Sequence, residues 1–93
     1  MAFALALGSA ALAQTTTPVG SAKATTTVSG VNHVISVETS GDEAAVTKPD
    51  GGAETVPANS SKTYTLKPGE KITIKVKVGG SEAIVTLTNT TAP

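Results

Sequence analysis

Cysteine, arginine and tryptophan are absent from this 93-residue chain. Without cysteine there is no disulfide framework, no thiolate nucleophile, no lipid-modified cysteine anchor and no zinc–sulfur site. Without arginine the chain lacks the planar group that binds phosphates and carboxylates through two parallel hydrogen bonds. The remaining charges cancel, since seven lysines stand against seven acidic residues. The composition therefore gives no long-range electrostatic attraction toward nucleic acid or an anionic membrane.

Aromatic residues are nearly as scarce, because Phe3 and Tyr64 are the only two. A single tyrosine after residue 13 cannot form the platform on which bases or sugar rings stack. We therefore expect no nucleic-acid partner and no sugar binding by stacking. Any hydrophobic core must be built from aliphatic side chains.

Residues 1–13 form an uncharged run rich in alanine and leucine that ends in Ala11-Leu12-Ala13. Small residues at positions −1 and −3 suit signal peptidase, so the pattern predicts a signal peptide with cleavage before Gln14. The run is shorter than the stretch of about 20 apolar residues that a membrane-spanning helix needs. We therefore expect a periplasmic or secreted protein with no membrane insertion after cleavage.

The basic segment that usually opens a signal peptide is missing, because no lysine precedes Lys23. We expect the natural start to lie upstream of Met1. The alternative is that residues 1–13 form an N-terminal helix packed on the domain. Residues 14–21 are rich in threonine, glycine and serine and contain one proline, which predicts a flexible leader before the folded domain.

The clearest local pattern is the strict alternation of Lys71-Ile-Thr-Ile-Lys-Val-Lys-Val78. Its aliphatic residues share one face and its polar residues share the other, which indicates a strand between a core and water. Pro68 and Gly69, just before it, suit the central positions of a type II turn. Gly79 and Gly80, just after it, supply residues that accept positive φ in a hairpin.

Similar runs rich in valine, isoleucine and threonine fill the rest of the expected domain, residues 22–90, and leave residues 91–93 as a tail. The segment from Asn89 onward is expected to fray or to form the end of a linker. Residues 82–88 have apolar side chains on both faces, which favours a central strand or one covered on both sides. The chain as a whole predicts an all-β fold, a small immunoglobulin-like β-sandwich of about seven short antiparallel strands. The expected strands are residues 24–28, 31–39, 44–48, 53–56, 62–66, 71–78 and 82–88.

The segment Tyr64-Thr-Leu-Lys-Pro-Gly-Glu-Lys-Ile-Thr-Ile-Lys-Val76 resembles bacterial immunoglobulin-like modules, in which a Leu-x-Pro-Gly-Glu turn leads into an alternating strand. The resemblance covers about thirteen residues and is a structural signature common to many unrelated sandwiches. It implies a sandwich fold and assigns no functional residue.

Catalysis by a Ser–His–acid arrangement would have to use His33, the only histidine. This residue falls among the apolar positions of a strand, beside Val31 and Ile35, and no nucleophile motif accompanies it. We expect a partly exposed side chain near a sheet edge, with its ring capped by a neighbouring threonine or serine. The acidic residues fall mostly in turns or at strand ends, which is unlike a glycosidase pair. The sequence predicts no enzyme, no catalytic residue and no cofactor.

Calcium is the metal that the composition leaves open, because it requires only oxygen ligands. Asp42 and Glu43 lie in one expected loop and Asp50 lies in the next, so the two loops could meet at one end of a sandwich. The alternative is that these are ordinary solvated turn residues. The spacing of an EF-hand is absent, and no metal-binding residue is assigned.

These expectations together favour an exported, non-catalytic interaction module that binds an unknown protein or a second copy of itself. The alternative is a structural subunit of a surface fibre or layer, in which the threonine-rich leader donates a strand to the next copy. Ala24–Val28 is predicted to be the binding edge, because Lys23 is the only charge beside it and an unpaired edge can accept another strand.

Overall fold

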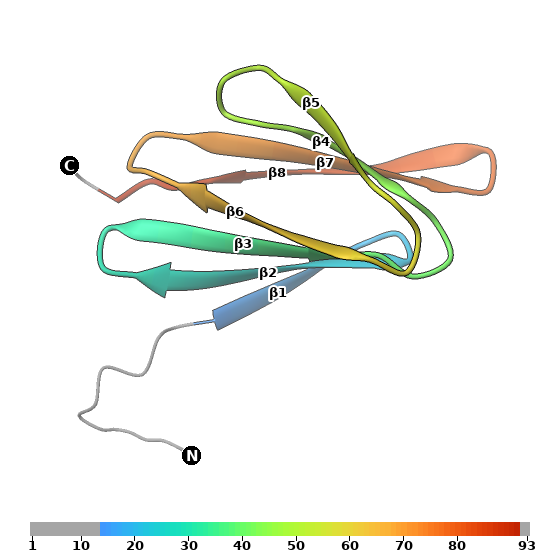
Figure 1. Ribbon diagram of the computed structural model, residues 1–93, viewed down its shortest axis with the longest axis horizontal. Helices are drawn as coiled ribbons and strands as arrows, with labels where there is room; N and C mark the ends of the chain where they lie inside the picture. Colours follow the sequence, from blue (N-terminus) through green and yellow to red (C-terminus); the bar gives the residue numbers. More distant parts are fainter. Residues whose placement is uncertain (1–13, 92–93) are drawn as a thin grey trace, which may run out of the picture.

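The computed structural model describes residues 14–91, so the predicted signal peptide at residues 1–13 and residues 92–93 lie outside the described residues. Within the described range the chain is all-β, as predicted, with eight strands in two antiparallel sheets of four. Sheet A has the strand order β1-β2-β3-β6, and sheet B has the order β5-β4-β7-β8 (Figure 1). The strands are β1 (Gln14–Val19), β2 (Ala22–Ser29), β3 (Asn32–Glu38), β4 (Ala44–Thr47), β5 (Ala53–Val56), β6 (Ser61–Leu66), β7 (Lys71–Val78) and β8 (Ser81–Thr88).

Strand β7 follows the predicted alternation from Lys71 to Lys77, whereas Val78, expected on the buried face, is 49% exposed. Ile72, Ile74 and Val76 are buried, whereas the lysines between and beside them are exposed. Strand β4 lies beside β7 and repeats the pattern over four residues, with alternate positions buried. The two strands form the centre of sheet B, because each has a hydrogen-bonded neighbour on both sides. The prediction of a half-buried strand over 71–78 is confirmed.

Strand β1 corrects the prediction of a flexible leader over residues 14–21. Gln14–Val19 pairs antiparallel with β2, and every residue of β1 has a partner there. Two side-chain hydrogen bonds support the pairing, one from Gln14 to Thr27 and one between Thr16 and Thr25. Only the last residue of β1 is buried. Gln14 and Thr16 find hydroxyl partners across the strand pair, which composition alone does not reveal.

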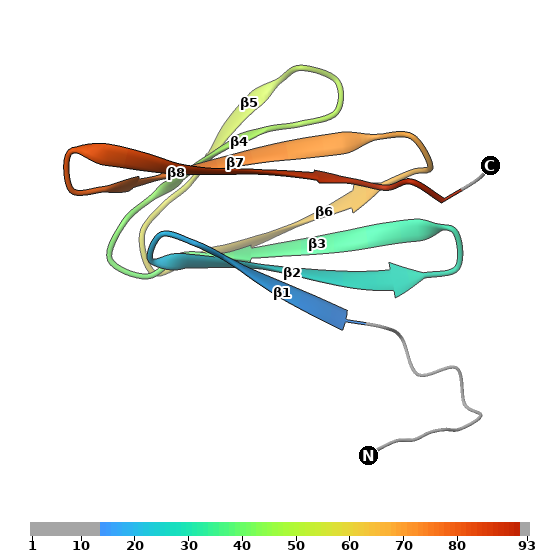
Figure 2. The same cartoon turned by 180° about the vertical axis from the view of Figure 1, so that it is seen from behind.

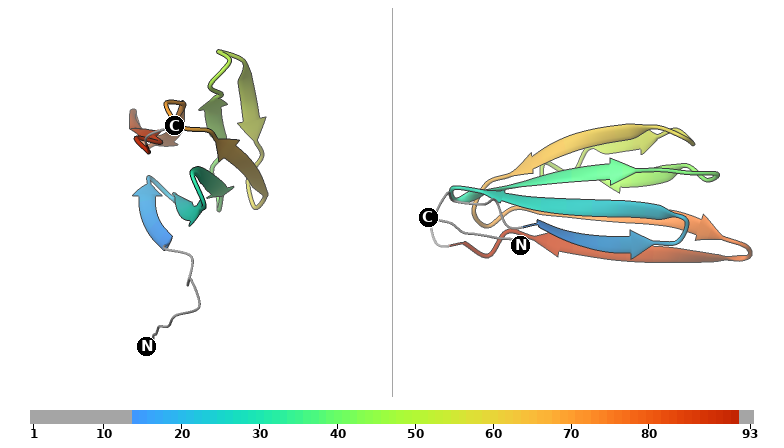
Figure 3. Two further views of the ribbon diagram at one scale, coloured as in Figure 1. Left: turned by 90° about the vertical axis from the view of Figure 1, so that its left-hand side faces the viewer. Right: turned by 90° about the horizontal axis from the view of Figure 1, so that it is seen from below.

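The edge strands lie in pairs on the two sides of the sandwich. Figures 1 and 2 show sheet B above sheet A from opposite directions. Strands β1 and β8, one from each sheet, contact each other on one side, and β5 and β6 lie on the other (Figure 3, left). The chain changes sheets after β3, after β5 and after β6. The prediction that Ala24–Val28 is an edge is therefore wrong, because β1 covers the outer side of β2.

The core lies between the sheets and is aliphatic, as the scarcity of aromatic residues requires. Tyr64 is only partly buried and packs against its border together with residues of β8. Burial of this aliphatic surface is the main stabilising contribution to the fold. The buried members are Val19, Ala22, Ala24, Ile35, Val37, Ala44, Val46, Val56, Leu66, Ile72, Ile74 and Val76.

The turn between β6 and β7 has the predicted geometry. Gly69 has a φ of 87°, and the Glu70 amide donates a 3.0 Å hydrogen bond to the Lys67 carbonyl, as in a type II turn. The Glu70 carboxylate in turn accepts a hydrogen bond of 2.7 Å from the Lys67 amide. The acidic side chain thus stabilises the turn that carries it.

Gly20, in the β1–β2 turn, makes a close approach to sheet B. Its φ is +62°, and a Cβ atom there would lie 2.8 Å from a methyl group of Val78 and 3.2 Å from one of Val76. Gly30, in the β2–β3 turn, has nearly the same φ of +66° but nothing within 4 Å of such a Cβ. The two glycines therefore share the backbone requirement and differ in the packing requirement.

We expect Gly20→Ala to lower the free energy of unfolding more than Gly30→Ala does. Both substitutions place an alanine in the left-handed region, which costs about 1–2 kcal/mol. Gly20→Ala must also displace the Val78 methyl, which adds about 1 kcal/mol. Chemical denaturation of the two variants measures the difference. Equal destabilisation would show that the contact between the β1–β2 turn and β7 is not tight.

Asn89 is the buried polar residue of the described chain, and it ties three segments together just after β8. Its side-chain Nδ2 donates 2.9 Å hydrogen bonds to the carbonyls of Val31 and Leu66. Its Oδ1 accepts one of 3.0 Å from the Thr91 amide. The expectation that the chain frays from Asn89 onward is wrong for this residue, because its amide satisfies carbonyls of the β2–β3 turn and of β6.

Candidate functional site

His33 lies in β3 and is partly buried, with Val28 and Leu66 as its neighbours across the sheet. Its Nε2 lies 3.4 Å from the Thr91 hydroxyl. The predicted threonine cap is thus present, although the threonine lies beyond β8. The prediction of a position near a sheet edge is wrong, since β3 lies between β2 and β6. Within residues 14–91 no acidic side chain is hydrogen-bonded to this ring.

The two acidic loops considered for calcium lie at opposite ends of β4. Asp42 and Glu43 precede Ala44, and Asp50 follows Thr47. Asp42 accepts a 3.0 Å hydrogen bond from the Ser21 hydroxyl, whereas Asp50 accepts one of 2.8 Å from the Gly52 amide in its own turn. Between residues 14 and 91 there is no group of three or more metal-binding side chains. The arrangement considered for calcium, in which the two loops meet at one end of the sandwich, is therefore not present among the described residues.

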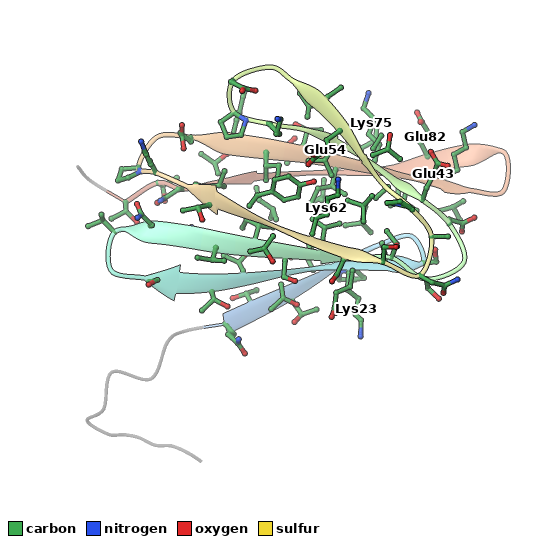
Figure 4. All side chains as sticks on the ribbon, in the orientation of Figure 1. Lys23, Glu43, Glu54, Lys62, Lys75 and Glu82 are labelled. Carbon is green, nitrogen blue, oxygen red and sulfur yellow. The ribbon has the colours of Figure 1, made fainter. Side chains whose placement is uncertain are left out.

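An open depression of about 430 Å³ lies beside the outer face of sheet B. Three acids and two lysines line it together with small residues, and Figure 4 shows Glu43, Glu82 and Lys75 in this region. The charges nearly balance, and each of these five side chains is exposed. Such a depression has neither the convergent polar groups nor the apolar lining of a small-molecule site. The charged members are Asp42, Glu43, Lys75, Lys77 and Glu82.

The side of the sandwich formed by β5 and β6 is closed by side chains from both sheets. Glu54 of β5 accepts a 2.7 Å hydrogen bond from the Tyr64 hydroxyl of β6, and its other oxygen lies 3.4 Å from the Lys62 ammonium (Figure 4). The bond from Tyr64 lowers the pKa of Glu54, and Lys62 acts in the same direction. Burial raises the pKa of Tyr64, and the bond to Glu54 adds to this effect. An inward lysine and a bridged tyrosine leave β6 poorly suited to accept a further strand.

Acid should weaken this closure. Because the folded pKa of Glu54 is lowered below its ordinary value of 4.5, the stability that it contributes is present above that value. It is lost as the pH falls through the folded pKa. We expect Glu54→Gln, which keeps an acceptor for Tyr64 but does not titrate, to show a weaker loss of stability between pH 5 and pH 3. Thermal melts across this range measure it. An equal loss of stability with falling pH in the wild-type protein and in Glu54→Gln would contradict the contribution assigned to Glu54.

Strand β8 is the edge that lacks such protection. It is eight residues long and contains Glu82 as its single charge, with no proline or glycine. Edge strand β1, by comparison, contains Pro18, which has no amide hydrogen to donate. Edge strand β5 has only four residues and is followed by Pro57. Long edges without charges, prolines or bulges are the ones that accept strands from other chains.

The side chains of β8 are incompletely covered on both faces. Ala83, Val85 and Leu87 face sheet A but are only partly buried, in contrast to their buried partners on β7. Ile84 faces outward and is 57% exposed, the most of any large hydrophobic residue between residues 14 and 91. The expectation that residues 82–88 form a central or doubly covered strand is therefore wrong. Adjacent apolar residues on the two faces here mark an uncovered edge.

The outer face of sheet A carries a second regular feature, a field of hydroxyl groups. The strand register aligns Thr16, Thr25, Ser36 and Thr63 in one row across all four strands. Lys23 and Glu38 lie directly opposite each other at one end of the field. Threonine is common on half-exposed strand faces, so the field is accounted for by strand preference.

The described residues include no helix long and apolar enough to cross a membrane. No family model matches the chain, and neither a curated protein nor a solved structure matches it at a significant level. The candidate site therefore depends on the geometry of β8 alone.

Proposed function

We propose that the chain is an exported, non-catalytic immunoglobulin-like β-sandwich that binds another protein by adding a strand to β8. Binding of this kind uses backbone hydrogen bonds for affinity and side chains on alternate faces for specificity. It needs no reactive group, which accords with the environment of His33, whose ring contacts the Thr91 hydroxyl and joins no cluster of acidic side chains in the described part of the chain.

The strand arrangement supports the immunoglobulin-like part of this proposal. With β1 set aside, β2-β3-β6 faces β5-β4-β7-β8, so that seven antiparallel strands form sheets of three and four. As in Greek-key sandwiches, the chain also crosses between the two sheets several times and does not complete one sheet before it starts the other. Strand β1 is then an addition at the edge of the smaller sheet.

Export is supported by the sequence of residues 1–13, which has the apolar run and the Ala-x-Ala end of a signal peptide. The mass of the protein recovered from an exporting host tests this directly. A mature chain that begins at Gln14 is the expected result, and an unprocessed chain confined to the cytoplasm would contradict it.

The single observation that supports strand addition is the unprotected edge of β8, with Ile84 exposed in its middle. A photoreactive amino acid introduced at Thr86, which is exposed on the outer face of β8, tests it in the native host. We expect a covalent adduct with a protein whose mass and cross-linked peptide identify it. The same amino acid at Thr55, exposed on β5, is the matched control and should give none.

The adduct at Thr86 should also disappear when Ile84→Lys is added, because a lysine guards an edge against strand addition. Equal adducts from Thr86 and Thr55, or none from Thr86, would overturn the proposal that β8 binds. An adduct that persists with Ile84→Lys would do the same.

A structural subunit of a fibre or layer is the second candidate function, because β8 would equally accept a strand donated by the next copy. The donor in that case is the threonine-rich segment, which here forms six cross-strand pairs with β2 of its own chain. These pairs must break before the segment can be donated. Open-ended growth in light scattering, instead of a closed small species, distinguishes the fibre from the interaction module.

A further inference from the structure

The geometry of β8 points to a second copy of this chain as its partner. We propose that two copies pair β8 against β8, antiparallel, about a two-fold axis that passes beside Val85. The pairing joins the two copies of sheet B into one continuous sheet. This inference rests on the proposed use of β8 as a binding edge and names what binds there.

The alternation of β8 restricts the registers that such a pair can adopt. Residues directly opposite each other on antiparallel strands project to the same face, so the partly buried row must meet the partly buried row. A pair centred on Val85 places Ala83 opposite Leu87 of the second copy and Val85 opposite its own equivalent. The row that faces sheet A then consists of apolar pairs throughout.

The neighbouring registers fit less well. A pair centred on Ile84 places Ser81 opposite Leu87 and so matches a hydroxyl with an aliphatic side chain in the inward row. A pair centred on Thr86 is cut short, because Asn89 is held by hydrogen bonds to Val31 and Leu66 and cannot extend the strand. The register about Val85 is the one that pairs every residue from Glu82 to Thr88.

The outward row is also complementary in this register. Ile84, the most exposed large hydrophobic residue of the described chain, lies opposite Thr86 of the second copy and covers its methyl group. Glu82 lies opposite Thr88, so no two like charges meet across the new pair.

The next strand adds a favourable charge on each side of the axis. Lys71 of β7 is the cross-strand partner of Thr88 within one chain. Glu82 of the second copy therefore lies two strand spacings from Lys71, about 10 Å between backbones, which long side chains can bridge. The arrangement occurs twice by symmetry.

The remaining edges offer no comparable self-pairing. Strand β1 is interrupted by Pro18, and β6 is tied to β5 by the contacts of Tyr64 and Lys62 with Glu54. Because β1 and β8 contact each other on the same side of the sandwich, pairing through β8 also brings the two copies of β1 together (Figure 3, left). The result is a closed two-fold dimer, as most soluble homo-oligomers are.

Sedimentation equilibrium of the full chain, purified after expression in an exporting host, tests the dimer over a wide concentration range. We expect a reversible monomer–dimer equilibrium that Ile84→Lys weakens by about tenfold or more, because two lysines then flank the axis. The matched control is Val31→Lys in the β2–β3 turn, where the native valine is 51% exposed. It should leave the equilibrium unchanged. Both wild-type positions are exposed, so neither variant should impair folding, which thermal melts verify.

The register is tested by introducing single cysteines, since the chain has none of its own. Ile84→Cys and Thr86→Cys proteins are mixed and oxidised gently. Directly opposite positions have Cβ atoms about 4.5–5.5 Å apart and diagonal ones about 7–8 Å apart, and a disulfide requires the shorter distance. We expect the mixed disulfide to exceed either homodisulfide. Val31→Cys should give no dimer.

Each contrary result overturns a stated part of the proposal. A monomer at all concentrations overturns self-pairing, while the adduct at Thr86 separately decides whether β8 binds any protein. A dimer that is unaffected by Ile84→Lys overturns β8 as the interface. A homodisulfide of Ile84→Cys that exceeds the mixed one overturns the register about Val85.

Discussion

Ile74→Ala should lower the free energy of unfolding by about 2–5 kcal/mol, because it deletes a fully buried side chain and leaves a cavity. Ile74 lies in β7 between Val46 of β4 and Val85 of β8, in the middle of sheet B. A domain of about 80 residues has a total stability of about 4–12 kcal/mol. The substitution therefore removes a large part of the total, and partial unfolding at ambient temperature is expected.

Two comparison variants separate the cavity from the general effect of substitution. Ile74→Val removes one methyl group and should cost about 0.5–1.5 kcal/mol. Val31→Ala removes an exposed side chain and should change stability by less than about 0.5 kcal/mol. Urea denaturation of the three variants at one low protein concentration measures the series. Similar values for Ile74→Ala and Val31→Ala would show that the core does not lie at β7.

Asn89→Ala has the second largest expected effect. Although it removes only one short polar side chain, it should lower the free energy of unfolding by about 2–4 kcal/mol. The substitution leaves the carbonyls of Val31 and Leu66 without their donor, and it removes the acceptor of the Thr91 amide. Because Asn89 is completely buried, water cannot replace these partners without opening the structure. Hydrogen exchange should be faster in the β2–β3 turn as well as at the end of β8.

Asn89→Asp provides the matched control, since it keeps the size of the side chain and exchanges two donors for acceptors. A carboxylate placed against two carbonyls would have a raised pKa in the folded state, so the variant should be least stable at neutral pH. Part of its stability should return as the pH falls and the carboxyl group protonates. Asn89→Ala should show no such recovery. A wild-type-like stability of either variant would contradict the role of the amide.

The residues of β7 show which part of the fold the sequence predicts well. Four aliphatic residues alternate with polar ones between Pro68-Gly69 and Gly79-Gly80, so local pattern and turn chemistry agree on the same strand. The structure places the strand at the same limits, Lys71–Val78. The signal is strong because burial of one face of the strand favours an aliphatic residue at every second position.

Strand β1 shows why the eighth strand escaped prediction. Its residues are mostly exposed and half of them are threonines, so they gain little by burial and no alternation marks them. The partners that hold them, such as Thr25 for Thr16 and Thr27 for Gln14, become visible only once the register with β2 is known. Proline at position 18 further favoured a loop, although proline is tolerated on an edge strand.

The binding edge was predicted at Ala24–Val28 instead of at β8 for a related reason. Ile84 and Val85 are adjacent, and the sequence does not state whether both faces of a strand are covered or one is open. The assignment of an edge depends on the order of strands in the sheet, which is set by contacts between distant residues. The same holds for Asn89, whose partner Val31 lies 58 residues away along the chain.

The position of Asn89 also bears on when the domain can fold. The amide that links the Val31 carbonyl of the β2–β3 turn to the Leu66 carbonyl of β6 is synthesised after all eight strands, so this link cannot form until residue 89 has left the ribosome. A growing chain that ends before this residue lacks the amide that closes the core beside Leu66, even when β8 is complete. The order of synthesis thus delays the completion of this buried hydrogen-bond network until the last strand of the described fold has been made.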